Sequence, residues 1–132
     1  MPDNIMQVDI VSPERVLFSG QATMVITRTL DGEIAFQPNH APFLAALSEN
    51  HTRIYEESGN VLHVAVHGGF VEVSNNKVSV LSDVAELADQ IDVNRAQAAR
   101  ERAEESLRRE QTDDAAAALK RAEARLAAAG RS

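Results

Sequence analysis

The sequence predicts an α+β protein in which an N-terminal antiparallel β-sandwich is followed by a C-terminal antiparallel α-helical hairpin. Up to Asp83 the chain consists of short β-branched and apolar runs separated by turn residues, which is typical of strands. After Asp83 it becomes rich in alanine and charged residues, with apolar positions three or four apart, which is typical of helices. This change predicts a division into a sandwich at residues 1–84 and a helical hairpin at residues 85–132.

The expected strands lie close together and are separated by recognisable turns. Asp31-Gly32 is a hairpin signal, Asn75-Asn76 turns the chain again, and Gly68-Gly69 predicts a bend between two strands. Residues 37–42 contain two prolines, so no regular element is expected there. Many short strands joined by tight turns favour a sandwich or a flattened barrel. The expected strands are residues 5–11, 16–18, 23–30, 33–36, 43–47, 51–56, 61–66, 70–73 and 78–81.

Two helices account for the remainder of the chain. Asp92 suits the N-cap of the first helix, and Thr112 or Asp113 suits that of the second. Gly130 is a natural stop. Because the connection is short, the helices should pair antiparallel. The stripes that would face each other are Ala96, Ala99, Ala103 and Leu107 in the first helix, and Ala115, Leu119, Ala122, Leu126 and Ala129 in the second.

The predominance of alanine along these stripes has an energetic consequence. Burying a methyl group is worth roughly 0.8 kcal/mol, so an alanine contact gains much less than a leucine contact. Alanine is nevertheless the best helix former, and Arg100–Glu104, Glu104–Arg108 and Glu105–Arg109 are possible ion pairs along the first helix. We therefore expect a hairpin that stays helical while it docks weakly, as a movable element would.

Composition and motifs exclude several classes of function. A formal net charge of −7 argues against nucleic acid as a partner. The chain has no cysteine, and His63 and His67, four residues apart on a strand, would lie roughly 13 Å apart, so no metal site is expected. These histidines are interpreted as sheet-surface or loop residues. Neither a G-x-S-x-G elbow nor a P-loop occurs, so we expect no enzyme.

Membrane insertion is not expected either. No stretch approaches the roughly 20 apolar residues that a membrane span requires. Aromatic residues make up only 4% of the chain, so the core of a soluble domain would have to be built from Val, Ile, Leu and Ala.

The helical segment carries the sharper chemical signal. Arg95, Arg102, Arg121 and Arg125 are distributed over both expected helices. If the helices pair antiparallel, several guanidinium groups could converge on one polyanion, because arginine binds phosphate through two hydrogen bonds at once. The alternative is that these are solvated arginines paired with glutamate, as on most exposed helices. The residues alone leave both interpretations open.

Several motifs together resemble the epsilon subunit of the bacterial F-type rotary ATP synthase, over nearly the whole chain. The resemblance is carried by Gly32-Glu33-Ile34, Pro38-Asn39-His40-Ala41-Pro42, Gly68-Gly69-Phe70-Val71-Glu72-Val73 and Val78-Ser79-Val80-Leu81. In that family the N-terminal part is a ten-stranded sandwich and the C-terminal part a helical hairpin. The segment 36–40 departs from the pattern, since the family more often has a Leu-Pro-Gly-His turn there.

The resemblance implies a non-catalytic subunit of the rotating central stalk, which couples proton flow to ATP synthesis. The sandwich would bind the gamma subunit and the c-ring, and the hairpin would inhibit ATP hydrolysis by extending along gamma into the catalytic alpha/beta head. The protein would lie at the cytoplasmic face of the bacterial cell membrane as a peripheral component. The alternative hypotheses are a free-standing nucleotide-binding sensor with the same fold and, less favoured, a small sandwich enzyme.

Some members of that family bind ATP between the two helices through a motif of the form I/L-D-x-x-R-A. The segment 91–96 matches it at every defined position. The resemblance therefore implies ATP as a regulatory ligand, with no cofactor required. It would place Glu86, Ile91, Asp92, Arg95 and Ala96 on the adenosine side, and Arg102, Arg121 and Arg125 at the phosphates.

Overall fold

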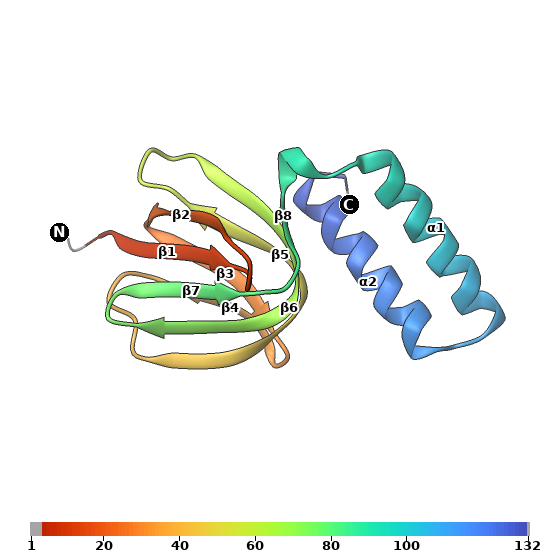
Figure 1. Cartoon of the computed structure of the whole chain (residues 1–132), viewed down its shortest axis with the longest axis horizontal. Helices are drawn as coiled ribbons and strands as arrows, with labels where there is room; N and C mark the ends of the chain where they lie inside the picture. The colour runs from red at the N-terminus through yellow and green to blue at the C-terminus, as the bar shows by residue number, and fades with distance from the viewer. Residues whose placement is uncertain (1–3, 132) are drawn as a thin grey trace.

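The computed structural model describes residues 4–131 and consists of a β-sandwich with a helical hairpin docked against one side (Figure 1). The predicted α+β class and the order of its two parts are confirmed. The elements are β1 (Met6–Val11), β2 (Val16–Ala22), β3 (Met24–Thr29), β4 (Gly32–Phe36), β5 (Phe43–Tyr55), β6 (Val61–Ser74), β7 (Lys77–Leu81), β8 (Ala85–Leu87), the 3-10 turn η1 (Ala88–Gln90), α1 (Val93–Arg109) and α2 (Asp113–Ala128).

The strands form one hydrogen-bonded path that folds back on itself into two layers. The strand order is β2-β1-β7-β6-β5-β3-β4, with β8 pairing with β6 beside this path. Each described pairing is antiparallel except one, because β1 runs parallel to β7 from Gln7 to Val11. The expectation of a wholly antiparallel sandwich is therefore wrong at this pair. Parallel neighbours require a long crossover, and here the intervening chain builds most of the sandwich.

The described residues form eight strands rather than the ten that the resemblance implied. The residues predicted nine strands. Four of the predicted segments are joined in pairs into the long strands β5 and β6, and β8 was not predicted. The bend expected at Gly68-Gly69 is present as two residues with positive φ, 80° and 106°, within β6. One neighbour of β6 changes at the glycines: residues before them pair with β8, and residues after them pair with β7.

The sandwich core is aliphatic, as its composition required. Along β1, Met6, Val8 and Ile10 are buried while the intervening residues are half-buried, so one face of the strand points inward. Fourteen buried residues form the main cluster of the described chain, and Phe36 is its one aromatic member. A second small group of polar residues, Thr27 and Thr52, is buried and hydrogen-bonded to Asn50.

Both helix starts follow the sequence prediction. The Asp92 carboxylate accepts a hydrogen bond from the Arg95 backbone N–H at 3.0 Å, and the Thr112 hydroxyl accepts one from the Ala115 N–H at 3.1 Å. Of the three expected ion pairs, Glu105–Arg109 is present at 3.2 Å, while the other two are not found among the described residues. Glu105 instead forms a second pair with Arg108 at 2.6 Å.

Helix α2 lies between α1 on one side and strands β5 and β6 on the other (Figure 1). The seam toward α1 is largely alanine, as predicted, with Ala96, Ala103, Ala115 and Ala122 buried. Helix α2 also has a second buried face, which its stripe of apolar residues did not predict, and there Ala128 packs on Ala65 of β6. Three buried residues, Ala65, Ile91 and Ala128, form this apolar contact, against fourteen in the sandwich core, so the hairpin rests on little apolar surface.

Candidate functional site

A cavity of about 310 Å³ lies where β8, η1, α1 and α2 meet. This volume is at the lower end of the range of small-molecule sites. β8 follows directly on the division expected after residue 84, and it belongs to the sheet through its pairing with Val64–Val66 of β6. The cavity therefore has walls from both parts of the chain. Its lining residues are Glu86, Gln90, Asp92, Arg95, Ala96, Ala99, Arg102 and Arg125.

The structure brings six of the eight sequence-predicted site residues together around this cavity. Ile91 is not among the lining residues, because its side chain is buried against Ala65 and Ala128. Arg121 is not among them either. It lies two helical turns before Ala128, which places it on the side of α2 that faces the sheet rather than on the side that faces α1. The six residues that line the cavity are Glu86, Asp92, Arg95, Ala96, Arg102 and Arg125.

Two lining residues were missed as site residues. Ala99 belongs to the alanine stripe that the sequence predicted, so its helical position was available as a signal. Gln90 lies in the short turn η1, which has no periodic pattern. Its side-chain oxygen accepts a hydrogen bond from the Leu87 N–H at 3.2 Å and closes the turn that joins β8 to α1.

The charges around the cavity favour an anion. Three guanidinium groups face two carboxylates, and the Asp92 carboxylate already caps helix α1. Arg95 and Arg102 are seven residues apart, so they lie on one face of α1 two turns from each other. Neither side chain forms an ion pair or hydrogen bond with any residue in 4–131, which leaves both cations available.

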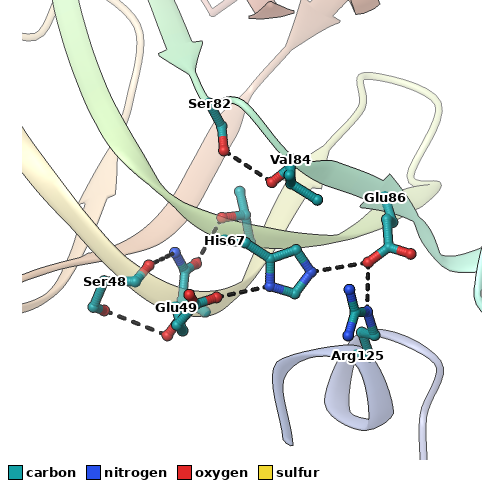
Figure 2. A network of polar contacts seen from close by, with 9 residues as sticks. Ser48, Glu49, His67, Ser82, Val84, Glu86 and Arg125 are labelled. Atoms are coloured by element: carbon teal, nitrogen blue, oxygen red, sulfur yellow. Dashed lines mark hydrogen bonds and ion pairs between the residues drawn. The ribbon is translucent and has the colours of Figure 1, made fainter. Parts of the chain in front are cut away.

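A chain of charged groups connects the third arginine to the sandwich (Figure 2). Arg125 donates from Nε to Oε1 of Glu86 at 2.7 Å, and the same oxygen lies 2.9 Å from Nε2 of His67. Nδ1 of His67 lies 2.7 Å from Oε2 of Glu49. The His67 side chain is only 3% exposed. This network joins β5, β6, β8 and α2.

The network determines the ionisation of Glu86. Burial alone would raise the pKa of the Glu86 carboxyl, but the hydrogen bonds from Arg125 and His67, together with their charges, lower it below its usual value of 4.5. Glu86 is therefore a carboxylate at neutral pH and offers its charge to the arginine of α2.

The interpretation of the histidines as sheet-surface or loop residues is wrong for His67. His67 is buried within the network rather than lying on the sheet surface. His63 is hydrogen-bonded to His51, with 2.7 Å between His63 Nδ1 and His51 Nε2. Burial, followed by the charges of His63 and Arg53, lowers the pKa of His51. Among residues 4–131 no group of three or more ligating side chains could hold a metal ion.

Comparison with known families accounts for the two parts of the chain. Residues 5–88 match the family model described as the β-sandwich domain of the ATP synthase delta/epsilon chain. Residues 89–130 match the one described as its long α-helix domain. The chain belongs to the ATP synthase epsilon-chain family. The two matches meet between β8 and η1, so Glu86 falls in the first and Arg125 in the second.

Similar curated proteins carry the same description. The ATP synthase epsilon chain of Brevibacillus brevis is 52% identical over 102 residues, which is 77% of each protein. The ATP synthase epsilon chain of Streptomyces coelicolor is 42% identical over 127 residues, or 96% of this chain and 97% of that protein. Likeness over nearly the full length of both proteins supports a subunit of the ATP synthase complex.

Solved structures share the fold at low sequence identity. A chain in the cryo-EM structure of the Euglena gracilis mitochondrial ATP synthase (OSCP, F1 and c-ring) has a TM-score of 0.82 at 20% identity, covering 98% of this chain and 82% of that one. A chain from the Tetrahymena thermophila central stalk and c-ring has a TM-score of 0.53 at 17% identity, covering 70% of each. Within residues 4–131, neither helix is long and apolar enough to cross a bilayer.

Proposed function

We propose that this chain is a non-catalytic subunit of the rotating central stalk, and that its helical hairpin is a mobile inhibitory arm whose docked pose is stabilised by ATP. In this function the sandwich transmits torque between proton flow and ATP synthesis. The arm, when released, extends along gamma toward the alpha/beta head and restrains ATP hydrolysis. The protein then acts at the cytoplasmic face of the cell membrane as a peripheral component.

The observation that carries the proposal is the cavity between the two helices and β8. Within residues 4–131, the side chains of Arg95 and Arg102 form no ion pair with a carboxylate. Arg125 donates to Glu86 from Nε alone, and its terminal nitrogens form no hydrogen bond with these residues. Guanidinium groups that line one cavity without a carboxylate partner are suited to phosphate oxygens. A nucleotide is the polyanion that fits such a site beside a small apolar wall formed by Ala96 and Ala99.

Ligand linkage explains how binding would control the arm. The cavity takes residues from the sandwich and from both helices, so it is complete only while the hairpin is docked. A ligand that binds only this state stabilises it by RT ln(1 + [L]/Kd), which is about 2.7 kcal/mol at a concentration one hundred times the Kd. Because the apolar docking contact is small, an increment of this size is enough to change the population of the two poses.

Partner surfaces are available on the sandwich. Phe70 of β6 and Leu81 of β7 face each other across the two strands, and both are exposed. Leu30, at the turn between β3 and β4, is 72% exposed. Exposed apolar side chains of this size favour contacts with other proteins. We assign these surfaces to gamma and the c-ring.

Calorimetric titration of the full chain with ATP tests the site. Arg102→Ala and Arg125→Ala should each weaken binding at least tenfold, since a charge-assisted hydrogen bond is worth about 1.5–3 kcal/mol. Arg109→Ala is the matched control, because Arg109 lies on the same helix, is exposed and contacts Glu105. Arg121→Ala should weaken ATP binding if Arg121 contacts the phosphates, and should leave the affinity unchanged if Arg121 only faces the sheet. Equal affinity in the Arg102 and Arg125 variants would remove the ATP site.

The inhibitory role needs the assembled complex. The chain contains no cysteine, so cysteines at Ala65 and Ala128, which pack against each other, can be cross-linked without background. Fixing the arm in this way should relieve inhibition of ATP hydrolysis in a reconstituted synthase, and reduction should restore it. Inhibition that persists after complete cross-linking would contradict a mobile arm. Co-elution with gamma separates this role from that of a free-standing sensor.

A further inference from the structure

We propose that His67 is the positioning residue that holds the helical hairpin on the sandwich, and that it does so as an imidazolium bridging Glu49 and Glu86. The proposal rests on the mobile hairpin of the proposed function and deepens it by naming the contact that retains the docked pose.

The hydrogen-bond geometry defines the charge state of the ring. Nδ1 faces Oε2 of Glu49 at 2.7 Å and Nε2 faces Oε1 of Glu86 at 2.9 Å. A carboxylate oxygen only accepts, and a neutral imidazole carries one N–H, so both contacts are hydrogen bonds only when both ring nitrogens are protonated. The ring is nearly enclosed, which removes water as a substitute partner for either nitrogen.

His67 acts on the arm through a shared atom. The Glu86 oxygen that accepts from His67 is the same Oε1 that accepts from Arg125 of α2 (Figure 2). A proton on the ring fixes this oxygen and offsets the repulsion between two carboxylates on the strands that flank β6. Without that proton, Glu86 loses a partner, and the carboxylate is no longer oriented toward α2. The polar attachment of the arm is then weakened where its apolar contact is already small.

The surroundings of His67 are dominated by anions. Glu49 faces it from β5 and Glu86 from β8, while Asp83, in the segment before β8, lines an adjoining cavity that His67 also lines. Arg125 approaches from α2 but is paired with Glu86. On β6 itself, His63 is engaged with His51.

The test measures arm docking in the nucleotide-free full chain by energy transfer between dyes attached at Glu57→Cys and Glu104→Cys. Both positions are exposed, one on the sandwich and one on α1. The otherwise native protein gives the reference value of the docked fraction at neutral pH. The nitrogen chemical shifts of the His67 ring, which differ between imidazole and imidazolium, give a second readout.

The variants separate positioning from mere packing. His67→Phe should lower the docking equilibrium constant about tenfold or more, since one charge-assisted hydrogen bond is worth at least that factor. Glu49→Gln keeps a side chain of the same size but removes one of the two charges that the ring bridges, so it should also lower docking, by a smaller factor. His63→Gln is the matched control on the same strand and should dock as the native protein does. Circular dichroism of the sandwich verifies folding of each variant.

A His67→Phe or Glu49→Gln variant that docks as the native protein does, or a His67 ring with the nitrogen shifts of a neutral imidazole, would overturn the proposal. Neither readout involves ATP or gamma. A failure here therefore differs from a failure of the ATP titration, which would remove the nucleotide site and leave the docking contact intact.

Discussion

Truncation of Leu126 to alanine should loosen the hairpin without affecting the sandwich. Leu126 is fully buried on α2, where nearly all the other buried residues of the hairpin are alanines. The change removes three carbon atoms, worth about 2.4 kcal/mol at roughly 0.8 kcal/mol each. The cavity left behind adds to this, up to about 5 kcal/mol in all. Since each 1.4 kcal/mol is a factor of ten, the opened fraction should rise at least about fiftyfold.

Amide hydrogen exchange is the appropriate assay, because it reports local opening separately from global unfolding. Protection of the amides of α2 should fall about fiftyfold or more in Leu126→Ala, while the amides of β1 and β7 should exchange as before. Leu107→Ala is the matched control on α1, where the leucine is only half-buried and the loss should be smaller. Equal loss of protection in the helices and in β1 would refute the reasoning, since it would mean that hairpin and sandwich open as one unit.

Three further outcomes can be measured. Gly69→Ala should destabilise the sandwich by more than about 2 kcal/mol in denaturant melts, since a Cβ there would overlap the Leu81 carbonyl oxygen and the residue has φ of 106°. Because the pKa of Glu86 is lowered in the folded chain, its contribution to docking should be present above pH 4.5 and lost as the pH falls through the lowered value, and Glu86→Gln should remove this dependence in an energy-transfer titration. The pKa of His51 is lower in the folded chain than in the unfolded chain, so the free energy of unfolding should decrease as the pH falls below 6.5. His51→Gln should reduce this dependence in thermal melts.

Local signals predicted most of the secondary structure. The helix starts at Asp92 and Thr112 follow from capping chemistry that depends on residues three positions apart. The alanine stripes follow from helical spacing, and the strands follow from short apolar runs. Arg125 joins the five expected site residues of β8 and α1 at one cavity because the hairpin is antiparallel, which a short connection already implied.

Non-local geometry accounts for what the sequence did not reveal. The role of His67 depends on Glu49 and Glu86, which lie 18 and 19 residues away on other strands, and no periodic pattern connects them. The position of Arg121 depends on the rotation of α2 between its two packing surfaces, and alanines on both surfaces made that rotation ambiguous. The parallel contact of β1 with β7 depends on the order of strands in space.

The short strand β8 has a consequence for any movement of the hairpin. Because β8 is paired with Val64–Val66, it keeps Glu86 on the sandwich, and η1 is the first segment after it about which the hairpin could turn. A hairpin that swings out about this hinge carries its arginines away from the glutamate, and the binding chamber ceases to exist as a whole. Occupancy is then tied to one pose, so the concentration of the ligand sets the fraction of subunits whose hairpin is docked.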